Sequence, residues 1–223
     1  FSMYINYFTL ILISLFSLGV GMPRRTNHPV KGSSIRVDPI RDLKDIKLIK
    51  KILIERPRDF ALFVLGINTN LRASDLLRIR VGDVRYLKPG EYFTLREKKT
   101  LKLRSITINK AVFDAIRQLL EDDQNVVDGD YLFRSRKKQS ASGGMLTVSY
   151  LNSLVKSWCS EINLRGNYGS HTLRKTFGYI HRTVFGTDIP TLMEMFNHSS
   201  QRQTLTYLGI QSCEIKDAYL KEI

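Results

Sequence analysis

The sequence is poor in the residues that build disulfide frameworks, metal sites and nucleotide-binding loops. Its 223 residues include only two cysteines, Cys159 and Cys213, with no CxxC pair and no zinc-ligand spacing. It also has no glycine-rich phosphate-binding loop, no HExxH motif and no cluster of carboxylates suited to Mg²⁺. We therefore expect a protein of a reducing compartment that uses no metal and no cofactor.

Charged residues are absent from the first segment of the chain. Residues 1–21 contain no lysine, arginine, aspartate or glutamate, and they include the apolar run Tyr7–Val20. A run of this length is typical of a signal peptide or a short transmembrane segment. However, the chain starts with Phe1, no basic region precedes the run, and Met22 opens a basic stretch that would suit a natural start. We interpret residues 1–21 as upstream sequence read through in the gene model, with a membrane anchor as the alternative.

Positive charge dominates the rest of the chain. Lysine and arginine number 35 against 21 aspartates and glutamates, which gives a formal net charge of +14 at pH 7, all of it within residues 22–223. Such an excess indicates a polyanionic partner, first nucleic acid and second an anionic membrane surface. Hydrophobic residues make up 43% of the chain, which is enough for one substantial packed domain.

Hydrophobic periodicity predicts a mainly α-helical fold with one small antiparallel β-sheet, an α+β class. Residues 22–41 are basic and aperiodic, so we expect a flexible arm there and a domain at 42–223. Apolar residues at three- and four-residue steps predict one helix that begins at Asp42 and is stopped by Pro57, and another around Phe60. Further helices are expected at residues 110–121, 148–162, 172–184, 188–197, 201–208 and 214–223.

Local signals add a capped turn, a hairpin and a loop to these helices. Ser74 is expected to cap a short helix, which places Arg72 in the turn just before it. The strand-like runs Tyr92–Leu95 and Leu103–Ile108 predict a β-hairpin with two adjacent lysines at its tip. Residues 134–144 are charged or small, so we expect a mobile loop there.

Two arginines, two histidines and a tyrosine follow one another in the order Arg72, His171, Arg174, His198 and Tyr207. The first lies in the segment LRASDLL, the next two form the motif HTLR, and the last two bound the segment HSSQRQTLTY. A guanidinium group can bind two phosphate oxygens at once, an imidazole can hold or move a proton near pH 7, and a phenol can act as a nucleophile. In this order and spacing, over roughly residues 45 to 210, the chain resembles the tyrosine recombinase (phage integrase) family.

The resemblance implies the catalytic domain of that family and a role for each of the five residues. Arg72 and Arg174 would neutralise the scissile phosphate, and Tyr207 would attack it. His171 would hydrogen-bond the phosphate or help to manage the tyrosine proton, and His198 would donate to a non-bridging oxygen. Taken singly, each residue has an ordinary structural alternative: a surface arginine, a satisfied histidine or a packed tyrosine.

In this family a lysine on a β-hairpin supplies the proton to the leaving 5′-oxygen. Lys99 is the first candidate, because it precedes a threonine and then Arg104 in the manner of the family's hairpin. Lys98 is the alternative, since sequence alone does not fix the register of a hairpin. Asp75 is expected to buttress or cap rather than to react. Asn197 stands where the family usually has glycine, a departure that could alter the turn but removes no functional group.

The resemblance implies a site-specific DNA recombinase or integrase that cleaves and rejoins DNA without metal or ATP. Tyr207 would form a 3′-phosphotyrosyl bond and free a 5′-hydroxyl. The implied partners are double-stranded DNA, three further copies of the chain in a homotetramer on two duplexes, and accessory DNA-bending proteins, in the cytoplasm at the nucleoid. Residues 214–223 would pack on a neighbouring protomer or in cis. Integration, excision, inversion and dimer resolution share this chemistry and are not distinguished.

One departure from the family and two rival functions stay open. Most members have a separate core-binding domain before the catalytic one, and residues 22–45 are too short for it. The chain therefore resembles either a truncated member or the compact recombinases that invert fimbrial promoters. The rivals are a DNA-binding regulator or remnant that does not cleave, and a membrane-attached basic protein anchored by residues 1–21.

Overall fold

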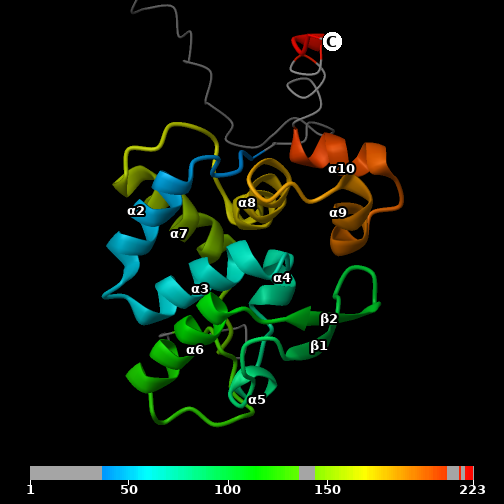
Figure 1. The fold of residues 1–223 in the computed structure, drawn as a ribbon. Coiled ribbons are helices and arrows are strands. Elements are labelled where there is room, and N and C mark those ends of the chain that lie inside the picture. Colours follow the sequence, from blue (N-terminus) through cyan, green and yellow to red (C-terminus); the bar gives the residue numbers. More distant parts are fainter. Residues whose placement is uncertain (1–36, 136–143, 210–215, 217–218, 223) are drawn as a thin grey trace, which may run out of the picture. The chain divides into compact units, whose positions relative to one another are not determined.

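The computed structural model describes residues 37–135, 144–209, 216 and 219–222. In this part of the chain, helices make up most of the fold, and one two-stranded antiparallel sheet lies at their side (Figure 1), which confirms the predicted fold class. The elements follow in the order α2 (Leu43–Leu53), α3 (Pro57–Asn68), α4 (Ala73–Leu76), α5 (Val81–Val84), β1 (Tyr92–Arg96), β2 (Leu103–Thr107), α6 (Lys110–Asp122), α7 (Val148–Glu161), α8 (Ser170–Thr183), α9 (Ile189–Phe196) and α10 (Gln201–Leu208).

Capping residues set the starts of most helices. Pro57 occupies the first turn of α3, where its missing N–H costs nothing. At the starts of five helices, a backbone N–H group donates a hydrogen bond to the side-chain oxygen of the capping residue. These capping residues are Asp42 for α2, Asn109 for α6, Thr147 for α7, Asp188 for α9 and Ser200 for α10. The helices predicted at 110–121, 148–162, 172–184, 188–197 and 201–208 are confirmed, each to within two residues at its ends.

The prediction that Ser74 caps the short helix is wrong. The helix α4 already begins at Ala73, so Ser74 lies inside it, and Arg72 occupies the cap position without a side-chain cap bond. The backbone N–H groups of Asp75 and Leu76 both donate to the Arg72 carbonyl. Because Leu76 is buried, packing on the core fixes this four-residue helix in place of a cap. The predicted place of Arg72, directly before the helix, is confirmed.

The two strands form the predicted hairpin, and Lys98 and Lys99 lie in its turn. Phe93 pairs with Ile106, and both side chains are buried against the helices. Side chains alternate between the two faces of a strand, so Arg104 shares the inner face with Ile106. The hairpin therefore directs one of its arginines towards the helical part of the fold.

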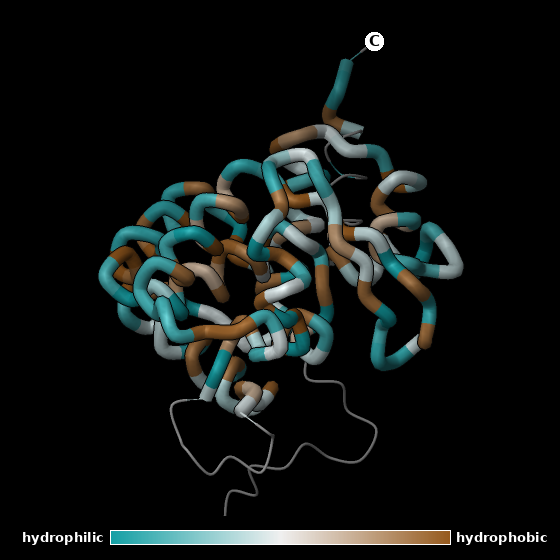
Figure 2. Tube along the Cα trace, turned by 90° about the horizontal axis from the view of Figure 1, so that it is seen from below, coloured by the Kyte–Doolittle hydropathy of each residue, from teal (hydrophilic) through white to brown (hydrophobic). Residues whose placement is uncertain are grey.

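Two hydrophobic clusters hold the described helices together. In Figure 2, hydrophobic and hydrophilic stretches alternate along most of the helices, as expected of elements with one buried face. The larger cluster gathers side chains from α2 to α8 and from the hairpin. The smaller cluster comprises Phe177, Leu192, Phe196 and Leu208, which come from α8, α9 and α10. The helices α9 and α10 thus pack around a small core of their own on one side of α8.

Some predicted segments fall outside the described residues. These are the apolar segment 1–21, most of the predicted arm, most of the loop at 134–144 and most of the terminal helix at 214–223. At the end of the predicted arm, Ile40 is fully buried and its N–H donates to Thr176 Oγ1, so these last residues pack with the domain. Among the residues that the structure does describe, no helix has the length and apolar character needed to cross a membrane.

Gly178 allows the small core to approach α8, and this close contact can be tested. A Cβ at this position would lie 2.5 Å from side-chain atoms of both Leu208 and Phe196. We expect Gly178→Ala to lower the free energy of unfolding by about 1–3 kcal/mol through overpacking. Urea unfolding measures this change, with Gly129→Ala as the control because a Cβ there meets no atom within 4 Å. Equal stability of the two variants would contradict the assigned role of Gly178.

Candidate active site

The structure draws the predicted residues from four places in the fold. Arg72 precedes α4, His171 and Arg174 lie on α8, His198 follows α9, and Tyr207 lies on α10. The charges of Arg72 and Arg174 both influence the pKa values of His198 and Tyr207, so these four side chains form one cluster. Burial, and then the charges of the same two arginines among others, lower the pKa of His171, so its imidazole lies near this cluster.

Arg174 lies deepest in the site. The residue is 3% exposed, and its guanidinium donates to the backbone carbonyls of Asn70, at 2.8 Å, and Phe196, at 2.9 Å. The guanidinium carbon also lies 5.0 Å from the centroid of the Phe196 ring. Burial lowers the pKa of Arg174 to about 10, against the opposing influence of Tyr207. The group therefore remains a cation at pH 7, and its orientation is fixed before any ligand binds.

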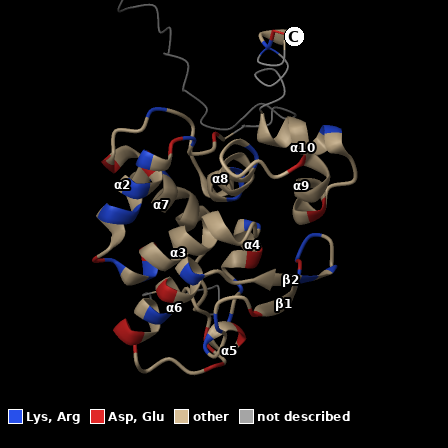
Figure 3. Cartoon of the chain, viewed as in Figure 1, with Lys and Arg blue, Asp and Glu red and all other residues tan. Residues whose placement is uncertain are grey.

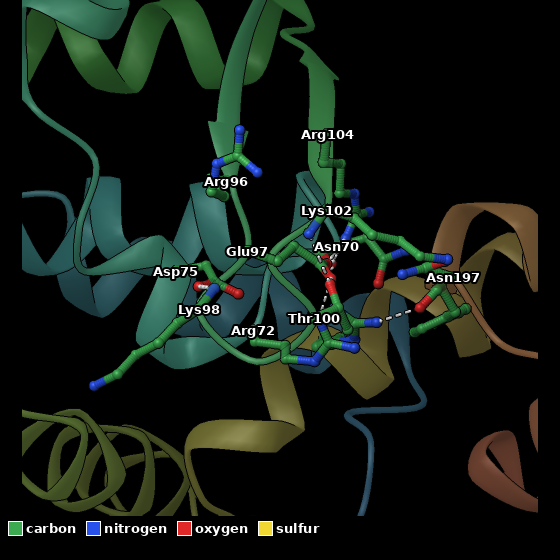
Figure 4. Close-up of polar contacts among 12 residues, drawn as sticks. Asn70, Arg72, Asp75, Arg96, Glu97, Lys98, Thr100, Lys102, Arg104 and Asn197 are labelled. Carbon is green, nitrogen blue, oxygen red and sulfur yellow. Dashed lines mark hydrogen bonds and ion pairs between the residues drawn. The ribbon is translucent and has the colours of Figure 1, made fainter.

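A buried carboxylate, Glu97, holds the other arginine of the site. Its side chain is 1% exposed and lies 2.6 Å from Arg72 Nη1 and 3.3 Å from Arg104 Nη1. Thr100 Oγ1 donates to the same carboxylate at 2.6 Å, as Figure 4 shows. Our sequence reasoning missed Glu97. The signal was present, because the two-residue alternation that turns Phe93 inward also turns residue 97 inward.

The charge state of Glu97 follows from its partners. Burial by itself would raise the pKa of this carboxyl group. Hydrogen bonds from Thr100 and Arg72, with the positive charges of Arg72 and Arg104, outweigh burial and lower the pKa to about 2. Glu97 is therefore an anion at every pH at which the protein is expected to work, and it offsets part of the positive charge of the arginines.

This lowered pKa predicts a pH-dependent loss of stability in Glu97→Gln. The folded-state pKa is below the ordinary value of 4.5, so the stability contributed by the carboxylate is present above about pH 4.5 and is lost as the pH falls towards 2. We expect the variant to lose on the order of 2 kcal/mol at pH 7 and much less near pH 3. Urea unfolding at both pH values measures the difference, with the exposed Glu55→Gln as control. A loss of equal size at both pH values would refute the assignment.

The C-terminal end of α9 is fastened by side chains from elsewhere in the fold. The Met195 carbonyl accepts hydrogen bonds from Asn70 Nδ2 at 2.6 Å and from Arg104 Nη2 at 2.7 Å, and the Phe196 carbonyl accepts the bond from Arg174. The last carbonyls of a helix have no partner within it, and they carry the negative end of its dipole. Two guanidinium groups therefore suit this end, and they fix the segment that leads to the second histidine.

Asn197 keeps the backbone conformation that favours the family's glycine. Its φ of 54° and ψ of 47° lie in the left-handed region, which asparagine adopts more readily than most other residues. Its side-chain oxygen accepts a hydrogen bond of 3.3 Å from Lys102 Nζ on the hairpin. The departure from glycine therefore preserves the turn and adds a contact between α9 and the hairpin, visible in Figure 4.

The conformation of Asn197 leads to a second prediction. We expect Asn197→Gly to fold with nearly the same stability, because glycine adopts this conformation freely. We expect Asn197→Val to lose about 1–2 kcal/mol, because a β-branched side chain clashes with its own backbone in the left-handed region. Thermal unfolding of both variants compares them. A valine variant as stable as the glycine variant would contradict the observed turn.

His198 and Tyr207 share one aromatic cluster with Phe196. The ring of His198 stacks on that of Phe196 at 5.1 Å between centroids, and the ring of Tyr207 lies 5.4 Å from that of His198. Nδ1 of His198 shares a hydrogen bond of 3.0 Å with Thr204 Oγ1, which orients the imidazole. Burial, then the charges of Arg174 and Arg72, lower the pKa of His198 to about 4. This imidazole is therefore neutral at pH 7.

The hydroxyl of Tyr207 is buried inside the cluster and makes no hydrogen bond of good geometry with the described residues. Burial raises the pKa of this phenol above its ordinary value, although the nearby Arg174 and Arg72 offset part of the rise. The ammonium of Lys175 lies 5.2 Å from the centroid of the phenol ring. Tyr207 is thus a neutral phenol beside two guanidinium groups.

His171 and Lys99 are the exposed members of the candidate site. The His171 side chain is exposed, yet partial burial and then the charges of Arg174, Lys175, Arg72 and Lys99 lower its pKa. The other hairpin lysine, Lys98, extends away from the Glu97 carboxylate in Figure 4.

The hairpin turn is also attached to α4. The backbone N–H of Lys98 donates to Asp75 Oδ1 at 2.9 Å, and Arg78 Nη1 lies 3.6 Å from the same oxygen. Asp75 therefore supports the turn, in agreement with the expected buttressing role. Within the described ranges, no three histidine, cysteine, aspartate or glutamate side chains are grouped so that they could hold a metal ion.

The family assignment follows from comparison with known proteins. The model of the phage integrase family matches residues 41–212. The chain belongs to this family, and it is a tyrosine recombinase.

Its relatives include the probable integrase/recombinase YoeC of Bacillus subtilis, 34% identical over 184 residues that cover 82% of this chain and 95% of the relative. The tyrosine recombinase XerC of Caldanaerobacter subterraneus is 31% identical over 169 residues, which cover 74% of this chain but only 45% of that protein. The chain thus spans nearly all of one relative and about half of the other.

Solved structures confirm the fold. A crystal structure of XerA recombinase gives a TM-score of 0.65 at 18% identity, over 96% of this chain and 73% of that one. The recombinase XerH, solved in a post-cleavage complex with palindromic difH substrate, gives a TM-score of 0.62 at 20% identity, over 81% of this chain and 52% of that one. Both are therefore built on the fold seen here.

Proposed function

We propose that this chain cleaves and rejoins DNA at specific sites through Tyr207. In the cleavage step the Tyr207 oxygen attacks the scissile phosphorus, the bond to the 5′-oxygen breaks, and a 3′-phosphotyrosyl bond and a free 5′-hydroxyl remain. The observation that carries the proposal is the buried Tyr207 hydroxyl, which lies within the electrostatic influence of Arg72 and Arg174. A phenol placed beside two guanidinium groups is placed where a phosphate would bind.

Arg72 and Arg174 would bind the non-bridging oxygens of the phosphate and stabilise the charge that gathers on them in the transition state. Arg174 is already oriented by its bonds to two backbone carbonyls, and Arg72 by the carboxylate of Glu97. Neutral His198 would donate a third hydrogen bond, with its ring oriented by Thr204. The Coulomb attraction is strengthened here because Arg174 and the Tyr207 hydroxyl are buried.

Two proton transfers complete the step. The phenol must lose its proton as it attacks, and we assign its acceptance to His171, whose lowered pKa leaves the imidazole neutral near pH 7. The leaving 5′-oxygen must gain a proton, and we assign its donation to Lys99, whose charge is felt at His171 while Lys98 extends away. Rejoining would run through the same groups in reverse, when a 5′-hydroxyl attacks the phosphotyrosyl bond.

Double-stranded DNA is the proposed partner. The net charge of +14 and the lysines and arginines at the hairpin tip and along α2, coloured blue on the ribbon of Figure 3, support binding to its phosphates. We propose further that four copies act on two duplexes, with accessory DNA-bending proteins, at the nucleoid. Known relatives support DNA as the partner: XerH and a Tn1549 transposon integrase were both solved in complex with DNA.

The proposal predicts a covalent adduct that depends on Tyr207. The full chain is incubated with nicked suicide duplexes tiled across the DNA that flanks its own gene, in the presence of EDTA. We expect a protein–DNA adduct on denaturing gels for the natural protein and none for Tyr207→Phe, because the variant lacks the attacking oxygen. The matched control is Tyr86→Phe, which changes an exposed tyrosine outside the site.

Gel-shift assays of the same samples separate binding from cleavage. Tyr207→Phe should bind the duplex as the natural protein does, since the substitution removes one buried hydroxyl and no positive charge. Binding of both proteins without an adduct would contradict the proposal and indicate a DNA-binding protein that does not cleave. An adduct that persists in Tyr207→Phe would show that another residue is the nucleophile.

A further inference from the structure

Glu97 touches two parts of the proposed site that would act on different atoms of one phosphate. Its oxygen Oε2 lies 2.6 Å from Arg72 Nη1 and accepts the hydrogen bond of 2.6 Å from Thr100 Oγ1. Thr100 directly follows Lys99 in the hairpin turn. One buried oxygen therefore connects the guanidinium that would bind the phosphate to the turn that carries the proposed proton donor.

We propose that Glu97 is a positioning residue that, through Thr100, sets the Lys99 ammonium relative to the phosphate bound by Arg72. The inference rests on the proposed function, because it assigns a task to the same site. Glu97 would itself touch no DNA. Its second oxygen, Oε1, lies 3.3 Å from Arg104 Nη1, so the carboxylate is held from both sides and has little freedom to move.

The turn needs such support, because its backbone is strained. Leu101 has a φ of 57° although it is not glycine, and its side chain is 65% exposed, so core packing does not enforce this conformation. Hydrogen bonds hold it in place instead. The Leu101 N–H donates to the Glu97 carbonyl at 2.9 Å, and Arg96 Nη1 donates to the Leu101 carbonyl at 2.7 Å. Together with the bond from Thr100, they close the turn around Glu97.

This arrangement gives the two adjacent lysines of the turn different surroundings. The Lys98 backbone is bonded to Asp75 and its side chain extends away from Glu97, as Figure 4 shows. The charge of Lys99, in contrast, reaches His171 within the site. Without the bond to Thr100, the exposed Lys99 would sample other orientations, and protonation of the leaving oxygen would slow. Binding of the phosphate by Arg72 would be unaffected.

A substrate with a sulfur atom in place of the bridging 5′-oxygen distinguishes these effects. Cleavage of the ordinary substrate releases an alkoxide unless a proton is supplied, and an alkoxide is a very strong base. Cleavage of the sulfur substrate breaks a P–S bond and releases a thiolate, the form that thiols of pKa about 8.5 adopt readily. The sulfur substrate therefore needs no proton donor, while it still needs Tyr207, Arg72 and Arg174.

We expect Thr100→Val to slow adduct formation about tenfold on the oxygen substrate, the order of effect of one hydrogen bond to a charged group, and less than twofold on the sulfur substrate. Lys99→Ala should lose about a hundredfold or more on the oxygen substrate and recover on sulfur. Valine has the shape of threonine, so the variant removes only the hydroxyl. Thr107→Val, an exposed threonine on the same hairpin, is the matched control and should cleave both substrates at the natural rate.

The outcomes separate the inference from the proposed function. If the natural protein forms no adduct on either substrate, the proposed function fails. If Lys99→Ala is not rescued by sulfur, the assignment of the proton donor fails. If Lys99→Ala is rescued but Thr100→Val cleaves both substrates at the natural rate, or loses equally on both, the positioning role of Glu97 is overturned.

Discussion

The structure of the site depends on offsetting the electrostatic repulsion between three arginines that are largely buried side by side. Arg72, Arg104 and Arg174 influence one another, and for Arg104 and Arg174 burial and the neighbouring guanidinium groups lower the pKa values. Glu97 is the anion that offsets this repulsion, and backbone carbonyls of Asn70 and of the end of α9 supply the remaining acceptors. The arginines are thereby held in place before a phosphate arrives, while the Glu97 carboxylate offsets part of their positive charge.

Burial, together with this positive charge, sets the protonation states of the reacting groups. Both oppose protonation of His171 and His198, whose pKa values are lowered by burial and by the nearby cations. Burial raises the pKa of Tyr207, so the phenol is neutral while its imidazole neighbours are neutral too. A bound phosphate would add negative charge and change the pKa values of all three groups. It would also bind to the arginines in the positions that they already occupy.

The placement of the nucleophile relies on a second, smaller core. The helices α9 and α10 pack on α8 through four apolar side chains, and Gly178 leaves the space in which they fit. Hydrogen bonds from Asn70, Arg104 and Arg174 fasten the end of α9 to the rest of the site. Arg174, which would bind the phosphate, therefore also holds the segment that carries His198 and leads to Tyr207.

The sequence by itself determined the helices of eight or more residues, the hairpin and the five motif residues, because periodicity, capping residues and spacing are local properties of a chain. It misplaced the start of α4, where packing of Leu76 outweighed the capping preference of Ser74. Only the tertiary structure decided that Glu97 links Arg72 to the hairpin turn and that the Lys98 side chain extends away from Glu97. These depend on contacts between residues distant in the chain and on desolvation, neither of which a one-dimensional pattern records.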